Sequence, residues 1–163
     1  MKKLLFLLAL VAFVPAAVQA KTLKFPSDAP MAEITIPDSW APKETDSGID
    51  ATSEDSAIYL AIDATDSKGV DKTIDDVFAF LQKNGVTVDD STKKQSEDKI
   101  NGMDMTNLDW DGKDSDGNVS IGVSLVSPSA GKLLVITYWG SKADQAKHTD
   151  ELTAIISSLK PAN

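Results

Sequence analysis

The sequence contains no cysteine and no arginine, and it has a single histidine among its 163 residues. The absence of cysteine excludes a thiol nucleophile, a Cys-ligated zinc, an iron–sulfur cluster and a disulfide framework. A single histidine excludes the metal sites that are built from two or three histidines. That residue, His148, lies close to apolar residues at helical spacing. We therefore interpret it as a boundary residue beside a buried stripe rather than as a catalytic base.

Acidic residues outnumber basic ones by 25 to 16, which gives a net charge of −9 at pH 7. Every basic residue other than the histidine is a lysine, whereas arginine is the residue that proteins use for bidentate contacts to phosphate and guanine. We therefore expect no binding to nucleic acid and none to anionic membranes. The acidity itself is typical of a soluble protein and indicates no particular ligand.

The first 20 residues have the three parts of a secretory signal peptide. Two lysines follow Met1, Leu4–Val14 is apolar, and Val18 and Ala20 are the small residues expected before the cleavage site. The apolar run is shorter than the ~20 residues that span a membrane. We predict export to the periplasm or secretion, with residues 1–20 as the signal peptide and residues 21–163 as a single α+β domain. Loss of the two lysines takes the net charge from −9 to −11.

The pattern of the mature chain predicts an α+β fold in which an antiparallel sheet carries two main helices. Apolar runs between turn residues predict strands at Lys21–Phe25, Ala32–Ile36, Gly48–Ser53, Ala57–Ala64, Met103–Trp110, Val119–Val126 and Lys132–Trp139. The last of these is apolar on both faces and is expected at the centre of the sheet. One helix is predicted from an N-cap at Thr73 to Asn84, and a second over Lys142–Leu159. The polar segment Asp89–Gly102 is interpreted as a connection that ends in an Asn-Gly turn.

This order of elements carries a family resemblance. Ile34–Trp40 reads ITIPDSW, Leu133–Ser141 reads LLVITYWGS, and Glu151–Pro161 reads ELTAIISSLKP. These segments resemble the PsbP-like α/β/α sandwich, whose relatives include small exported bacterial proteins similar to DcrB. The resemblance implies a non-enzymatic accessory or partner-binding role in the cell envelope. It brings no shared catalytic residues, and the metal sites of photosynthetic members have no matching positions here.

The stretch Asn107–Ser120, NLDWDGKDSDGNVS, is the best candidate for a metal site. With its first glycine at the sixth position of a calcium loop, Asn107, Asp109 and Asp111 fall at the first, third and fifth positions. The twelfth position is then Asn118, which lacks the bidentate carboxylate that such loops require. Asp-Gly and Gly-Asn are also typical of hairpin turns. We therefore predict a hairpin loop and no cofactor, with weak calcium binding as the alternative.

Three tryptophans, Trp40, Trp110 and Trp139, form a candidate ligand groove, because binding pockets favour aromatic side chains with a few polar groups. Each tryptophan also lies at the end of a predicted strand, where amphipathic rings commonly seal a core. Sealing of the core is the interpretation that we favour.

These features together predict an exported, monomeric and non-catalytic binding or accessory protein of the bacterial envelope, with an envelope protein as a candidate partner. A small periplasmic hydrolase that uses an Asp/Glu pair is the alternative from another class. Adjacent acids such as Asp75-Asp76 and Asp89-Asp90 are candidates for that pair, although neighbouring acids in polar segments are usually solvated.

Overall fold

A computed structural model describes residues 19–162, which form ten strands, two α-helices and one short 3-10 helix. The strands are β1 (Ala20–Phe25), β2 (Ala32–Pro37), β3 (Lys43–Glu44), β4 (Gly48–Thr52), β5 (Ile58–Asp66), β6 (Thr87–Ile100), β7 (Met103–Asp114), β8 (Gly117–Ser129), β9 (Lys132–Ser141) and β10 (Lys160–Pro161). The helices are η1 (Asp38–Trp40), α1 (Val70–Lys83) and α2 (Gln145–Ser157). The predicted signal peptide lies outside the described residues except for its last two.

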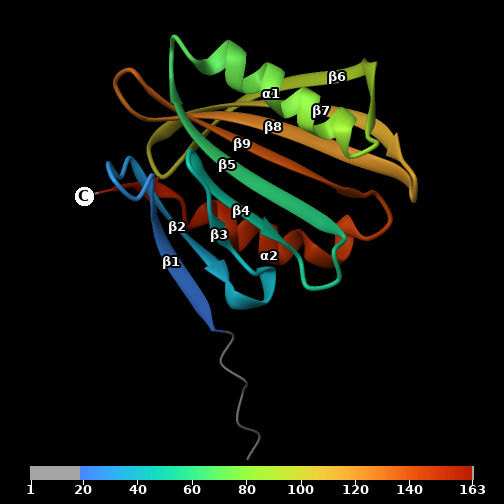
Figure 1. Cartoon of the computed structure of the whole chain (residues 1–163), viewed down its shortest axis with the longest axis horizontal. Coiled ribbons are helices and arrows are strands. Elements are labelled where there is room, and N and C mark those ends of the chain that lie inside the picture. The colour runs from blue at the N-terminus through green and yellow to red at the C-terminus, as the bar shows by residue number, and fades with distance from the viewer. Residues whose placement is uncertain (1–18, 163) are drawn as a thin grey trace, which may run out of the picture.

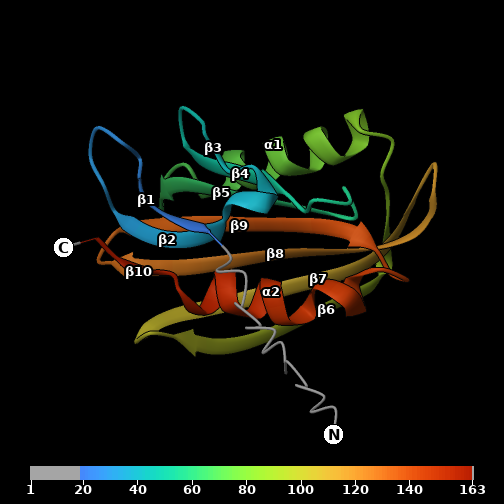
Figure 2. The ribbon, with the colours of Figure 1, turned by 90° about the horizontal axis from the view of Figure 1, so that it is seen from below.

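The elements form three layers around a large antiparallel sheet. This sheet has seven strands in the order β3-β4-β5-β9-β8-β7-β6, and a smaller sheet has the order β1-β2-β10. Helix α1 covers one face of the large sheet, while α2 and the small sheet cover the other (Figures 1 and 2). The predicted α+β class and the α/β/α sandwich are confirmed. Strand β9 lies in the middle of the large sheet, as its apolar pattern indicates.

Two hydrophobic cores fill the two faces of the large sheet. The core beneath α1, here the α1 core, combines helix residues with the inward positions of β7, β8 and β9: Val77, Leu81, Val86, Trp110, Val119, Ile121, Val123 and Val135. The core on the α2 side is larger and is built from β1, β2, β4, β5, β9 and α2, with Ile34, Trp40, Leu60, Ile136, Ile155 and Leu159 among its members. Alternate residues of β9 enter different cores, because successive strand side chains point to opposite faces.

The prediction of a polar connection over residues 89–102 is wrong. Most of that segment belongs to β6, a 14-residue strand at the edge of the large sheet. It shows no apolar alternation because nearly every residue is exposed on both faces. Lysines and acids on an edge strand also discourage pairing with another chain. The predicted turn is confirmed, since Asn101 and Gly102 both have positive φ, at 48° and 84°.

Both helices differ from their predicted bounds. Helix α1 begins at Val70, so Thr73 lies inside its first turn rather than at the N-cap, and its hydroxyl donates to the Gly69 carbonyl. Helix α2 is shorter at both ends than predicted and stops at Ser157. Beyond it, Lys160 and Pro161 pair with β2 as the small strand β10. Among the described residues, no helix is long and apolar enough to cross a membrane.

Candidate functional site

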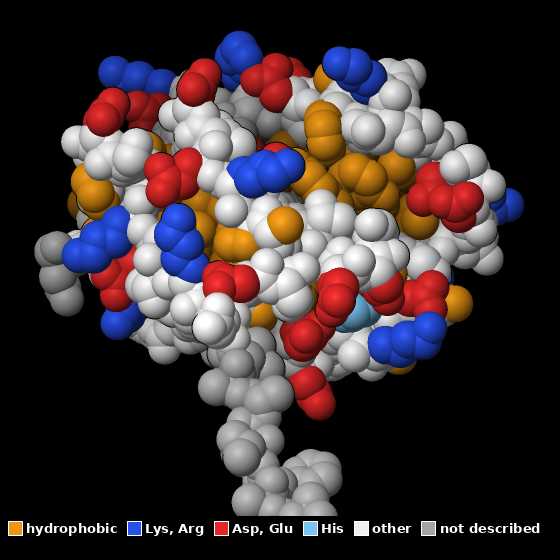
Figure 3. Space-filling model, turned by 60° about the horizontal axis from the view of Figure 1, so that its bottom comes forward, with side chains coloured by type: hydrophobic (Ala, Val, Ile, Leu, Met, Phe, Trp, Pro, Cys, Tyr) orange, Lys and Arg blue, Asp and Glu red, His pale blue; other side chains and the backbone are white. Residues whose placement is uncertain are grey.

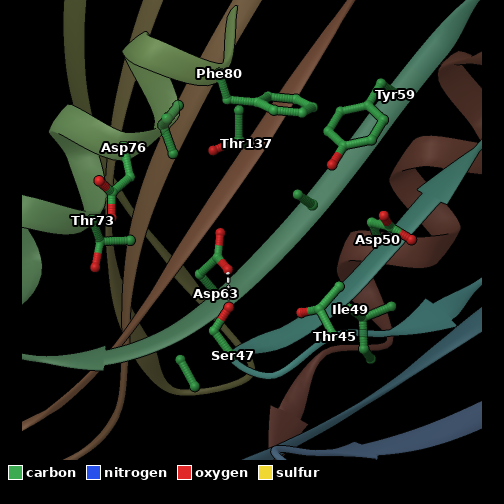
Figure 4. Close-up of a pocket in the computed structure, with 13 residues that line it drawn as sticks. Thr45, Ser47, Ile49, Asp50, Tyr59, Asp63, Thr73, Asp76, Phe80 and Thr137 are labelled. Atoms are coloured by element: carbon green, nitrogen blue, oxygen red, sulfur yellow. Dashed lines mark hydrogen bonds between the residues drawn. The ribbon is translucent and has the colours of Figure 1, made fainter.

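A cleft opens on the α1 side of the large sheet, where the helix leaves strands β3, β4 and part of β5 uncovered. Its cavity volume is about 350 Å³, within the range typical of small-molecule sites. The cleft is lined by Thr45, Ser47, Ile49, Asp50, Tyr59, Ala61, Asp63, Ala64, Thr73, Asp76, Val77, Phe80 and Thr137 (Figure 4). Four separate parts of the chain therefore contribute: the β3–β4 hairpin, β5, α1 and β9.

The floor of the cleft follows from strand register. Ala61 of β5 pairs with Asp50 of β4 on one side and with Thr137 of β9 on the other. Paired residues point to the same face of an antiparallel sheet, so these three side chains form one row across three strands. The methyl group of Ala61, in the middle of the row, leaves the hollow open. Tyr59 and Asp63, two positions away along β5, form its two ends.

One end of the cleft is aromatic. The ring of Tyr59 lies 4.7 Å from that of Trp139 and 5.3 Å from that of Phe80, measured between centroids. Phe80 is 38% exposed and is the one large hydrophobic residue of residues 19–162 that remains so accessible. The face shown in Figure 3 carries a patch of exposed hydrophobic surface with acidic side chains on its right and a lysine on its left. An exposed aromatic wall beside a cavity indicates a place where an apolar ligand surface is buried.

The other end of the cleft is acidic. Asp63 accepts a hydrogen bond of 2.5 Å from the hydroxyl of Ser47, and Asp50 lies across the floor on β4 (Figure 4). Burial, followed by the charges of Asp50 and Asp63, raises the pKa of Tyr59 to about 12. The tyrosine is therefore a neutral hydroxyl at physiological pH. Asp76, on α1, is engaged in an ion pair with Lys72.

Thr137 supplies an unusual feature of the floor. Its side chain is 1% exposed, and its Oγ1 is the one buried side-chain polar atom of the described residues without a hydrogen-bond partner. The serine hydroxyl and the other threonine hydroxyls around the cleft are engaged: Thr45 accepts from the amide of Gly48, Ser47 donates to Asp63, and Thr73 donates to a backbone carbonyl. Buried polar groups are normally paired. The hydroxyl of Thr137 is thus an unpaired polar group in the floor of the cleft.

The calcium candidates are not brought together. Asn107, Asp109 and Asp111 lie in β7 at alternate positions, on the face opposite to the α1 core, and so are spread along an extended strand at about 6.6 Å per two residues. Each has its own partner: Ser124 donates to Asn107 at 2.6 Å, Tyr138 donates to Asp109 at 3.1 Å, and Lys142 pairs with Asp111 at 2.6 Å. Within residues 19–162, no group of three or more His, Cys, Asp or Glu side chains could hold a metal ion.

The predicted hairpin over this stretch exists, but its loop is much shorter than expected. Strands β7 and β8 pair as far as Asp114 and Gly117, which leaves two residues in the turn. Asp114 accepts hydrogen bonds from the amides of Asp116 and Gly117, and Gly117 has a φ of 136°. Asn118, the remaining calcium candidate, pairs with Lys113 in the ladder. Most of the stretch interpreted as a loop is therefore strand.

The three tryptophans lie in different places. Trp40 is 1% exposed in the core on the α2 side, and Trp110 is 5% exposed in the α1 core on the opposite face of the large sheet. Trp139 packs against Tyr59 and Phe80, beside the cleft described above. The structure therefore does not unite them in one groove, and each contributes to sealing a core.

The candidate acid pairs do not face each other either. Asp76 lines the cleft in its ion pair with Lys72. Asp89 accepts hydrogen bonds from the amide and hydroxyl of Ser91 in β6. Neighbouring residues on a helix or strand point in different directions, so neither pair converges on a common space.

His148 lies outside the cleft, on the α2 side of the sheet. Its Nδ1 is 2.8 Å from Glu151 Oε2 and its Nε2 is 3.0 Å from Asp55 Oδ2, and its ring meets that of Trp40 edge-on. Figure 3 shows the histidine, in pale blue, among acidic side chains. The predicted boundary position is confirmed, since the side chain is 14% exposed. This network could not be predicted from the sequence, because Asp55 is far from His148 along the chain.

The carboxylates around His148 shift its pKa. Hydrogen bonds to Glu151 and then Asp55 raise the pKa of His148 above its usual 6.5. The hydrogen bond from His148 is the largest of the contacts that lower the pKa of Asp55 below its usual 3.8. The raised pKa of the histidine stabilises the fold at low pH, and this stability is lost as pH rises through the folded-state pKa. The lowered pKa of the aspartate stabilises the fold at higher pH, and this stability is lost as pH falls through the folded-state pKa. Both contributions are present together between about pH 4 and 6.5.

Sequence reasoning missed the cleft, although part of its signal is visible. Tyr59, Ala61 and Asp63 alternate on one face of a predicted strand, and Thr137 is a hydroxyl within an apolar central strand. The sequence pattern does not show that β9 pairs with β5, because β9 lies far along the chain from β4 and β5.

Comparison with solved structures shows that the chain has the PsbP-like fold. It is similar to cyanobacterial PsbP (CyanoP) from Synechocystis sp. PCC 6803, with 9% identity and a TM-score of 0.61 over 89% of this chain and 94% of that one. It is also similar to LpqN, involved in cell envelope biogenesis of Mycobacterium tuberculosis, with 13% identity and a TM-score of 0.57 over 89% and 91% of the two chains. The sequence matches no protein-family model and no curated protein.

Proposed function

We propose that the protein is an exported, non-catalytic binding module of the bacterial envelope, and that it binds a small molecule in the cleft beside α1. The observation that carries this proposal is the unpaired hydroxyl of Thr137 at the floor of a cavity with an exposed aromatic wall. Export is supported by the signal-peptide pattern. The structural likeness to LpqN, which is involved in cell envelope biogenesis, agrees with this location.

The chemistry of the cleft supports binding rather than catalysis. Its polar groups are three carboxylates and the hydroxyls of threonine, serine and tyrosine. A hydroxyl nucleophile needs an adjacent base that is itself held in place by a third group. The Ser47 hydroxyl instead donates to Asp63 in a single pair, and the histidine of the chain lies on the other side of the sheet, bound to Asp55 and Glu151.

A thermal-shift screen with a variant that fills the cleft tests the proposal. Ala61→Phe places a ring in the centre of the floor, whereas Ala154→Phe adds the same ring at an exposed position of α2 and is the matched control. The screen uses amines, sugars, amino acids, carboxylic acids and nucleosides. A ligand at 100 times its dissociation constant adds about 2.7 kcal/mol to the unfolding free energy. We expect such a shift in the native chain and in Ala154→Phe, and none in Ala61→Phe.

Three results would contradict the proposal. A ligand that stabilises Ala61→Phe as strongly as the native chain binds elsewhere. A ligand that is consumed during incubation, as measured by mass spectrometry, identifies the protein as an enzyme. A screen in which no compound class gives a shift that Ala61→Phe removes also counts against a binding cleft.

A further inference from the structure

The charges around the cleft restrict which ligands it can hold. Asp50 and Asp63 face the cavity, and neither forms an ion pair with a lysine within residues 19–162, whereas Asp76 is paired with Lys72. An anionic ligand would meet two carboxylates in a partly desolvated site, where like charges repel more strongly than in water. A ligand with a positive charge would be attracted for the same reason.

The aromatic end of the cleft favours the same charge. Tyr59 and Phe80 line the cavity (Figure 4), and aromatic rings attract organic cations that lie within about 6 Å of the ring. The rings also offer apolar surface to the body of a ligand. A cation with an apolar body therefore matches both ends of the cleft, whereas a purely polar molecule matches only one.

The unpaired hydroxyl supplies an observation that is independent of the carboxylates. Thr137 Oγ1 is buried in the floor row next to Ala61, between the acidic and aromatic ends. An ammonium group carries several N–H donors and no acceptor. One N–H can donate to Thr137 Oγ1 while others donate to the carboxylate oxygens, and this satisfies the threonine without leaving an unpaired group on the ligand.

A metal ion does not fit these groups. Within residues 19–162, no group of three or more His, Cys, Asp or Glu side chains could hold a metal ion, and the cleft offers only hydroxyls beside its carboxylates. The cavity of about 350 Å³ can contain a small organic molecule.

From these observations we propose that the cleft binds a small organic ammonium ion with an aromatic or other apolar body. This inference rests on the proposed function. Asp50, Asp63 and Thr137 hold the charged end, and Tyr59 and Phe80 contact the body. Lys43 lies opposite Asp50 in the β3–β4 pair and is exposed, so it competes with the ligand for the charge of Asp50.

Isothermal titration calorimetry with three molecules of similar shape tests the charge preference. Phenethylamine is the cationic probe, phenethyl alcohol is its neutral analogue, and phenylacetate is the anionic one. We expect phenethylamine to bind to the native chain, the alcohol to bind about tenfold or more weakly, and the anion not to bind, since a charged hydrogen bond contributes about 1.5–3 kcal/mol.

Variants then locate the charged end. Asp63→Asn keeps an oxygen that can accept from Ser47, and Asp50→Asn changes only the charge of a floor residue, so both are expected to fold; circular dichroism and a melting curve verify this. Each should weaken phenethylamine binding by about tenfold or more. Asp150→Asn, an identical change at an exposed position of α2, should have no effect. Lys43→Gln should tighten binding, because it removes the competing charge.

The outcomes separate this inference from the proposed function. Equal binding of the amine and the alcohol, or equal affinities of Asp63→Asn, Asp50→Asn and Asp150→Asn, overturns the ammonium assignment. If phenethylamine does not bind while a neutral or anionic compound of the screen binds in an Ala61-dependent way, the inference fails and the proposed function stands. If no compound binds in that way, the inference and the proposed function both fail, and the Thr137 hydroxyl has no partner other than water.

Discussion

Replacement of Thr137 by valine is the most direct test of the unpaired hydroxyl. Valine has nearly the shape of threonine, and both residues suit a strand. The substitution therefore removes one buried polar atom and leaves the packing almost unchanged. A buried polar group without a partner costs about 1–3 kcal/mol, so Thr137→Val should stabilise the free protein by about 1 kcal/mol. At this chain length, that corresponds to an increase in melting temperature of about 4 °C.

Urea denaturation, followed by tryptophan fluorescence, measures the change as a shift in midpoint at constant slope. Thr92→Val is the matched control. Thr92 also lies in a strand, but its Oγ1 accepts from the amide of Asp111 at 2.8 Å and donates to the carbonyl of Asp89 at 2.7 Å. That variant should lose about 1 kcal/mol or more. If Thr137→Val is destabilised like Thr92→Val, the hydroxyl has a partner in the free protein and the reasoning about the floor is refuted.

Three further predictions concern other parts of the molecule. Ile155→Ala should lower the free energy of unfolding by about 2–5 kcal/mol, because this side chain of α2 is 1% exposed in the core. Ile156→Ala should lower it less, because Ile156 is only partly buried. Equal losses would show that α2 packs differently. His148→Gln should lower the free energy of unfolding most between about pH 4 and 6.5, and less at lower and higher pH. A loss that is the same at all pH values would exclude the charged network. Melting curves in millimolar calcium and in chelator should coincide, and a rise with calcium that disappears in Asp109→Ala would show that the strand residues do bind the ion.

The success of the sequence analysis followed the burial of each segment. Strand β9 was placed at the centre of the sheet because both of its faces are buried, with Leu134 and Ile136 in one core and Val135 in the other. Strand β6 was missed because it is exposed on both faces, so no hydrophobic period marks it. Alternation of apolar and polar residues along a strand indicates that one face of the strand is buried. An edge strand that is exposed to solvent on both faces shows no such alternation.

The same limit explains the candidate sites. The calcium hypothesis assumed that residues close in sequence converge around an ion, but an extended strand separates Asn107, Asp109 and Asp111. The cleft has the opposite arrangement, because Thr137 is distant in sequence from Asp50 and Ala61 and joins them in one row through strand pairing. Composition identifies such residues as polar members of apolar strands, and only the topology shows that they meet.

The position of the cleft also follows from the dimensions of the fold. Helix α1 runs roughly along the strands (Figure 1), so it covers a width of one helix diameter, ~10–12 Å, whereas seven strands spaced by about 4.8 Å make a sheet about 29 Å wide. The helix connects β5 to β6 at the far edge and packs over β7, β8 and β9 in the α1 core, so it cannot also cover β3 and β4. Asp50 lies on the uncovered strand β4 and Asp63 on its neighbour β5. A single helix on a sheet of this width therefore leaves a recess with an acidic end and an aromatic end, and the side chains that line the recess determine which ligand it can hold.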